Sequence, residues 1–113
     1  MNSLSTHILD TARGRPAAGV AVSLAVRAGE QWTELVRAAT DADGRLKFVL
    51  PAGTILTAGV TCRLRFETGD YFRGQGTPAF HPVIELTFTL QDDGHHHVPL
   101  LVSPFGYTTY RGS

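Results

Sequence analysis

The sequence has little cysteine, no net charge and no long hydrophobic run, and each shortage excludes a class of protein. Its 113 residues include one cysteine, Cys62, which cannot form an internal disulfide, so we expect a cytoplasmic protein rather than a disulfide-stabilised secreted one. Ten basic and ten acidic residues cancel, and without a Lys/Arg cluster we expect no nucleic-acid partner. No apolar stretch approaches the roughly 18 residues of a membrane span and no signal-peptide pattern opens the chain, so we expect no membrane partner.

Apolar and polar residues alternate along most of the chain, which is typical of half-buried β-strands. Cys62 lies on the apolar face of one such run, residues 60–66, where we expect a buried core residue. Turn signals rich in glycine, proline and aspartate separate the runs. The pattern predicts an all-β protein, a two-sheet sandwich forming one domain over residues 1–113. We expect strands near residues 4–10, 19–26, 32–39, 45–49, 60–67, 83–90, 96–102 and 107–111, and a short helix near residues 70–75, where alternation is lost.

Three consecutive histidines, His95, His96 and His97, form the densest group of titratable side chains. On a strand, His95 and His97 lie on one face and His96 on the other. Two imidazoles could begin a zinc site, but such a site needs a third protein ligand, and His7 and His81 are the only other histidines. We therefore expect no metal, and interpret the triplet either as a polar strand start or as the location of a catalytic imidazole.

Two further residues, His7 and Arg45, have side chains suited to hydrolytic chemistry. His7 shares one face of a predicted strand with Ser5, and its imidazole is either a hydrogen-bonded structural group or an acid or base near neutral pH. Arg45 follows an Asp-Gly dipeptide, which predicts a hairpin rather than a calcium loop because the distal glutamate of such a loop is absent. Its guanidinium either pairs with a surface carboxylate or holds an anionic ligand. The sequence contains no G-x-S-x-G motif and no obvious base partner beside Cys62, so nothing in it indicates covalent catalysis.

Four segments near the two ends of the chain form recognisable motifs: Ser5-Thr6-His7-Ile8-Leu9-Asp10, Gly14-x-Pro16-Ala17, His95-x-His97-Val98-Pro99-Leu100-Leu101-Val102-Ser103-Pro104 and Tyr107-Thr108-Thr109-Tyr110-Arg111-Gly112-Ser113. With these segments the chain resembles the transthyretin-related 5-hydroxyisourate hydrolases, and the resemblance covers essentially the whole sequence. The ending Tyr110-Arg111-Gly112-Ser113 is its most specific part, because transthyretin itself shares the fold but does not keep this tetrapeptide.

One departure from the family is His96, at a position that is commonly aromatic. Because His96 points away from the other two histidines, we expect it to have a local effect only and an aromatic replacement to be tolerated.

The resemblance implies a transthyretin (prealbumin)-like sandwich of two four-stranded sheets with one short helix, assembled as a homotetramer, a dimer of dimers with sites between dimers. It implies a hydrolase that opens the six-membered ring of 5-hydroxyisourate to 2-oxo-4-hydroxy-4-carboxy-5-ureidoimidazoline in urate degradation, without metal or organic cofactor. The alternatives are a carrier that binds a small aromatic ligand without catalysis, and a prealbumin-like interaction module.

The family's site residues can be carried over onto this chain by motif. Its catalytic residues fall on His7, Arg45 and His97, and its substrate-binding residues on Tyr110, Arg111, Gly112 and Ser113. The two histidines share proton transfer, and which of them activates water stays open. Arg45, either alone or together with Arg111, would hold the ring through planar N–H donors. A chain end often frays, but this tail is short and follows a strand without a flexible linker, so we expect it to be held in the site. If Gly112 turns it into the site, we expect a positive φ there.

Overall fold

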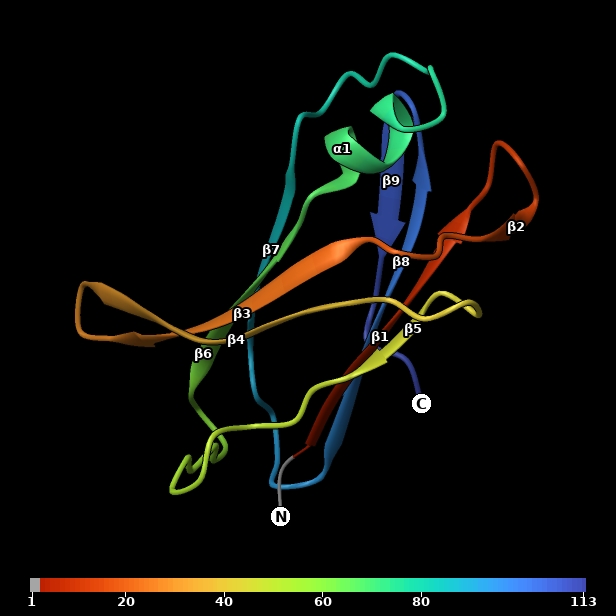
Figure 1. Ribbon diagram of the computed structural model, residues 1–113. Helices are drawn as coiled ribbons and strands as arrows, with labels where there is room; N and C mark the ends of the chain where they lie inside the picture. Colours follow the sequence, from red (N-terminus) through yellow and green to blue (C-terminus); the bar gives the residue numbers. More distant parts are fainter. Residues whose placement is uncertain (1–2) are drawn as a thin grey trace.

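The computed structural model describes residues 3–113 and shows two β-sheets packed face to face, with one short helix at one end (Figure 1). The first sheet contains β2 (Arg15–Pro16), β1 (Ser3–Asp10), β8 (His95–Ser103) and β9 (Gly106–Thr109) in that order, and β5 (Arg45–Lys47) also pairs with β1. The second sheet has the order β4 (Gln31–Ala39), β3 (Ala21–Ala28), β6 (Thr61–Phe66) and β7 (Ile84–Thr89), and the helix is α1 (Thr68–Arg73). Because β2 and β5 occupy successive parts of one edge of β1, each layer is four strands wide, and the predicted transthyretin-like sandwich is confirmed.

The predicted strands are present, with ends that differ from the prediction by at most two residues, and β5 is one of those that are shorter than expected. That strand was expected to reach residue 49 but ends at Lys47, shortly before Pro51, which has no backbone N–H to donate. The helix begins at Thr68 rather than at residue 70. Gly69, which the sequence pattern indicates as part of a turn, belongs to the first turn of the helix. A Cβ on Gly69 would lie 2.5 Å from the carbonyl oxygen of Pro82, so the absence of a side chain lets this loop pack against the helix.

The core lies between the sheets and follows the alternation of the strands. Along β1 every second residue is buried, namely Leu4, Thr6, Ile8 and Asp10, each 0% exposed, while Ser5, His7 and Leu9 are only partly buried on the opposite face. The predicted core residue Cys62 is also fully buried, and this burial raises the pKa of its thiol to about 11. A thiol with that pKa stays protonated near neutral pH and is a poor nucleophile. No helix within residues 3–113 is long and apolar enough to cross a membrane.

Candidate active site

Three strands from distant parts of the chain bring the three predicted catalytic residues to the outer face of the first sheet. β1 and β8 run parallel, with Ser5 opposite His97, and β5 runs antiparallel to β1 on its other side, with Arg45 opposite His7. Directly paired residues point to the same face of a sheet. His7, Arg45 and His97 therefore share the outer surface, where the alternation that buries Leu4 leaves polar side chains.

A cavity of about 300 Å³ crosses this surface from β5 to the end of the chain. Arg45 and Lys47 supply positive charge at one side, and the terminal residue Ser113 lies at the other. The cavity is lined by Ser5, Thr6, Arg45, Leu46, Lys47, His95, His97 and Ser113. Its donors and imidazoles suit a small, electron-rich polar ligand.

The ring of His7 is oriented by the turn between β4 and β5. Its Nε2 donates a hydrogen bond of 2.9 Å to the backbone oxygen of Asp43, and since a carbonyl only accepts, Nε2 carries a proton. The other ring nitrogen, Nδ1, is the atom that can take up or release one. The carboxylate of Asp41 holds the turn by accepting hydrogen bonds of 2.9 Å from the backbone N–H groups of Asp43 and Arg45.

The predicted turn at Gly44 is present, but the predicted hairpin is wrong. β4 and β5 belong to different sheets, so the chain crosses from one layer to the other at this point. Gly44 has a φ of 74°, and a Cβ there would lie 2.5 Å from the backbone oxygen of Ile8. The turn consequently sits directly against β1, which brings the Asp43 carbonyl within reach of His7.

His97 is held neutral by its surroundings. Partial burial, followed by the positive charges of His7, His95 and Arg45, lowers the pKa of His97 below its ordinary value. A neutral imidazole is the form that accepts a proton. Its Nδ1 lies 2.7 Å from the hydroxyl oxygen of Ser5, which leaves Nε2 as the nitrogen for a ligand or water.

The chain end continues β9 as an extended segment beside β8 rather than fraying. The register that pairs Leu100 with Thr109 also pairs His97 with Gly112, whose N–H donates a 2.7 Å hydrogen bond to the backbone oxygen of His97. Gly112 does not have the positive φ considered from the sequence. A glycine is required at position 112 for a steric reason. A Cβ there would lie 2.7 Å from Cδ2 of His97 and 3.2 Å from Cγ of Pro99.

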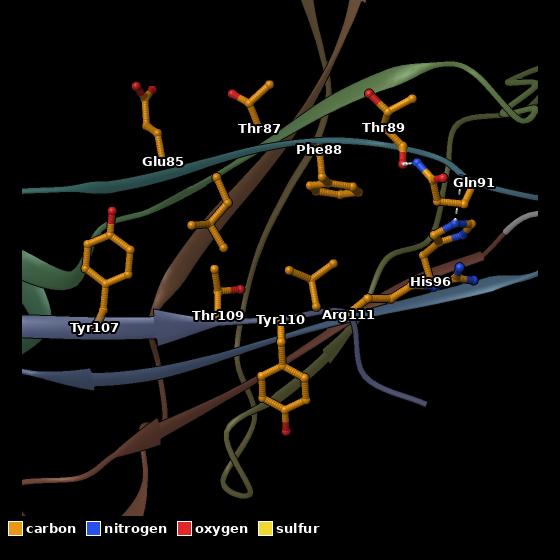
Figure 2. Close-up of a pocket in the computed structure, with 12 residues that line it drawn as sticks. Glu85, Thr87, Phe88, Thr89, Gln91, His96, Tyr107, Thr109, Tyr110 and Arg111 are labelled. Carbon is orange, nitrogen blue, oxygen red and sulfur yellow. Dashed lines mark hydrogen bonds between the residues drawn. The ribbon is translucent and has the colours of Figure 1, made fainter.

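The other two tail residues lie by a second cavity, of about 420 Å³, at the edge between β7 and β9 (Figure 2). The Arg111 guanidinium donates to the carboxylate of Asp92 at 3.1 Å and to the backbone oxygen of His95 at 3.4 Å. The ring of Tyr110 points away from this cavity (Figure 2). The structure thus places Ser113 in the cavity of His97 and Gly112 beside His97 itself, whereas Tyr110 and Arg111 lie by the second cavity.

His96 lies on the opposite face from its two neighbours, as predicted, and is 2% exposed. Its Nε2 accepts a 3.1 Å hydrogen bond from the backbone N–H of Gln91 (Figure 2), and its Nδ1 donates to the backbone oxygen of Gly94 at 3.2 Å. Both partners belong to the turn between β7 and β8, so the role of His96 is local. A phenylalanine in its place would leave the Gln91 N–H without this acceptor.

Two features of this surface were missed from the sequence. Lys47 adds a second cation beside Arg45, and Ser5 bridges the imidazoles of His95 and His97 with contacts of 2.8 and 2.7 Å. The alternation already placed Ser5 on the face of His7, but only the pairing of β1 with β8 shows which residues lie opposite it. Within residues 3–113, no three His, Cys, Asp or Glu side chains are grouped so as to hold a metal ion.

Comparisons with known proteins show the family of this chain. The profile of the HIUase/Transthyretin family matches residues 4–112. The 5-hydroxyisourate hydrolase of Caulobacter vibrioides is 50% identical over 118 aligned residues, which cover 100% of both chains. The structure of Klebsiella pneumoniae 5-hydroxyisourate hydrolase is 39% identical with a TM-score of 0.82, covering 100% of this chain and 94% of that one. Sea bream transthyretin in complex with thyroxine is 35% identical with a TM-score of 0.86, covering 96% and 93%. The chain belongs to the HIUase/Transthyretin family.

Proposed function

We propose that this protein is a 5-hydroxyisourate hydrolase, which opens the six-membered ring of its substrate with water in urate degradation. The full-length relative from Caulobacter vibrioides carries this name at 50% identity. The observation that supports the chemistry most directly is the cavity beside His7 that Arg45 and His97 line together, with the chain end fixed against His97. It combines a neutral imidazole, a cationic donor and a protonated ring nitrogen on one surface.

Each step of ring opening has a group in this site. Water loses a proton as its oxygen bonds to the ring carbonyl carbon, negative charge collects on the carbonyl oxygen, and the leaving nitrogen takes up a proton as the C–N bond breaks. A neutral His97 can accept the first proton, and the guanidinium of Arg45 can stabilise the oxyanion. His7 has a protonated Nε2 and a second nitrogen for exchange, so we assign proton transfer to His7 and His97 jointly.

Mixing the protein with freshly generated 5-hydroxyisourate tests this proposal. Urate oxidase produces the substrate from urate, and the ultraviolet decay of the product is followed with and without the protein. Acceleration that saturates with substrate supports the hydrolase. The likeness to sea bream transthyretin in complex with thyroxine favours a second candidate, a carrier of a small aromatic ligand. Ligand binding without acceleration would support the carrier and contradict the hydrolase.

Arg45→Lys is expected to lose activity although the positive charge is kept. An ammonium cannot reproduce the planar, forked N–H donors that match adjacent carbonyl and N–H groups of a urate-like ring. We expect kcat/KM for 5-hydroxyisourate to fall at least about tenfold, roughly the loss of one charge-assisted hydrogen bond. Lys47→Arg, on the same strand and in the same cavity, is the matched control and should fall less. Unchanged turnover and unchanged substrate affinity in Arg45→Lys would show that Arg45 is a surface residue with no role in the reaction.

We propose further that the chain assembles as a homotetramer, a dimer of dimers with sites in the channel between dimers. Within the described residues β7 pairs only with β6 and β9 only with β8, so both strands present an open edge for pairing with another copy. Apolar side chains gather near these edges, with Phe105 72% and Phe80 69% exposed. This placement supports an interface there, beside the second cavity.

The mass in solution tests this assembly. Light scattering during size exclusion is expected to give about four times the 12.2 kDa of the chain. Phe105→Asp would place a charge at the exposed apolar edge and should shift the protein to smaller species. A monomer that retains full hydrolase activity would contradict the proposed arrangement of sites between dimers.

We also propose that residues 1–113 act as one domain in the cytoplasm. A single cluster of buried residues, from Leu4 to Val102, draws on both sheets, which supports one cooperative unit. The only cysteine, Cys62, is a free and buried thiol, so no disulfide requires an oxidising compartment.

A further inference from the structure

A row of hydroxyls and imidazoles extends from the site toward solvent along β1 and β8. The hydroxyl oxygen of Ser5 lies 2.7 Å from Nδ1 of His97 and 2.8 Å from Nε2 of His95. On the far side of the His95 ring, Nδ1 contacts the hydroxyl of Ser3. The rings of His95 and His97 are stacked with centroids 6.5 Å apart, and His95 is exposed whereas His97 is partly buried.

The parallel pairing of β1 with β8 produces this row. Ser5 is paired with His97, and Ser3 with His95, so one serine lies beside each of the two histidines that share a face. Only Ser5 lies within hydrogen-bond distance of both rings. His97 therefore has a single hydroxyl between it and the exposed imidazole.

We propose that Ser5 is a positioning residue that connects His97 to His95 in a proton relay, and that this relay converts His97 from the base to the acid of the hydrolysis. The inference rests on the proposed role of His97 in proton transfer. It adds Ser5 and His95 to the residues on which the reaction depends, although neither exchanges a proton with the substrate directly.

Counting protons defines the two states of the relay. Serine has one hydroxyl proton, so Ser5 can donate to only one of its two imidazole neighbours. In one state Nδ1 of His97 donates to Ser5 and Ser5 donates to Nε2 of His95, which leaves Nε2 of His97 unprotonated. In the other state every hydrogen bond is reversed, and Nε2 of His97 carries the proton. Both states leave both rings neutral.

The reaction uses the two states in turn. Nε2 of His97 takes a proton from the attacking water, Nδ1 passes its proton to Ser5, and the Ser5 hydroxyl proton moves to Nε2 of His95. His95 then releases the proton on its Nδ1 to solvent. One proton enters and one leaves, and only N–H and O–H bonds change. His97 is now neutral with a proton on Nε2, which it can donate to the leaving nitrogen. As it does so the relay runs in reverse: Ser5 returns a proton to Nδ1 of His97, Nε2 of His95 returns one to Ser5, and Nδ1 of His95 takes one from solvent, which restores the first state.

The relay matters because the surroundings of His97 disfavour its charged form. Partial burial, and in addition the permanent positive charge of Arg45, act against an imidazolium at this position. The pair Arg45 and Lys47 is fixed on the neighbouring strand. A relay that exports a proton as another arrives avoids holding this extra charge in the site.

The test compares two serines on the same face of the same strand. Ser5→Ala removes the connection between the histidines, and we expect kcat to fall roughly tenfold to a hundredfold, less than the roughly 10² to 10⁴ contributed by a positioned acid or base. Ser3→Ala is the matched control and should stay within about twofold, because water can replace its hydroxyl at the exposed edge of His95. Ser5→Thr keeps the hydroxyl and should restore most of the rate.

A double-mutant cycle separates a relay from a structural role. His95→Phe should lower kcat by a similar factor to Ser5→Ala, and the double variant should be no worse than either, because both changes interrupt one path. The solvent isotope effect in mixtures of H₂O and D₂O should show more than one moving proton in the parent and fewer in Ser5→Ala. Additive losses, or an unchanged isotope effect, would overturn the relay.

Imidazole nitrogen NMR of the substrate-free protein tests the connection without relying on activity. His95→Phe is expected to shift the nitrogen resonances of His97 in the parent but not in the Ser5→Ala background. Parent-like rates in Ser5→Ala beside an inactive His97→Ala would overturn the relay and leave the proposed hydrolase standing. A parent protein that does not accelerate the decay of 5-hydroxyisourate would refute the proposed function and the catalytic relay with it.

Discussion

His97→Ala is expected to lower the rate of 5-hydroxyisourate opening by about 10² to 10⁴, the contribution of a positioned acid or base, while the sandwich stays folded. The alanine removes the neutral imidazole that faces the cavity. His95 also contacts Ser5, but among the described residues it is His97 that is paired with Gly112 of the chain end, so His95 does not replace it. His97 lies on the outer face, so its truncation leaves the buried residues of β8 in place. The decay assay measures the loss, and the melting temperature reports the fold.

His7→Ala should produce a loss of the same order, because proton transfer is proposed to involve the ring of His7 as well, which lies opposite Arg45. His81→Ala is the matched control. The ring of His81 packs edge-on against Phe80 and Tyr107 and does not line the site cavity. Near-parent rates in His7→Ala or His97→Ala would remove that histidine from the mechanism, and an equal loss in His81→Ala would indicate a general effect on folding or assembly.

Gly112→Val is expected to reduce activity by about a hundredfold or more without unfolding the protein. Its Cβ would be built 2.7 Å from the ring of His97, so either the ring or the chain end must move, and displacement of a catalytic group by about 1 Å can cost on the order of a hundredfold in rate. Residues 110–113 follow the last strand, β9, and are half-buried or exposed, so the core should persist. Turnover of 5-hydroxyisourate and the melting temperature together measure this prediction.

The close approach of Gly112 to the ring of His97 allows a sharper test than Gly112→Val alone. Gly112→Ala should already lose most of the activity, because the collision begins at Cβ. Gly106→Ala, at the first residue of β9, is the matched control, since a Cβ there meets only the Ser103 hydroxyl oxygen at 3.9 Å. Deletion of residues 110–113 should behave like Gly112→Val. Full activity in the truncated protein and in both Gly112 variants would exclude the tail from the site and strengthen the carrier alternative.

Most of the fold could be predicted from the sequence because half-buried strands show their periodicity directly. The alternation in β1, β6 and β7 identified which residues form the core, including Cys62. The two-residue strand β2 was missed because two residues are too short to show a period. The turn at Asp43-Gly44 was predicted, but turn chemistry does not say whether the flanking strands pair with each other or cross between sheets.

The site could be predicted in part for a related reason. Alternation placed Ser5 with His7 and separated His96 from its neighbours, and both placements hold. The register between distant strands is decided by the packing of the whole sandwich, so the contact of Ser5 with His97 could not be read from either segment alone. The same limit applies to Arg111, whose ion pair with Asp92 depends on where the turn before β8 lies.

The pairing of β1 with β8, which lie far apart in the sequence, affects how the protein folds during synthesis. Ser5 and His97 are separated by 92 positions in the chain. β1 therefore leaves the ribosome long before β8, its neighbour in the sheet. Closing a loop of that length costs conformational entropy before any contact is gained, which slows folding. The surface that carries His7, Arg45 and His97 can therefore form only after β8 has been synthesised. Until then, β1 lacks its neighbour β8, and this unpaired edge is where a nascent or truncated chain is most exposed to aggregation.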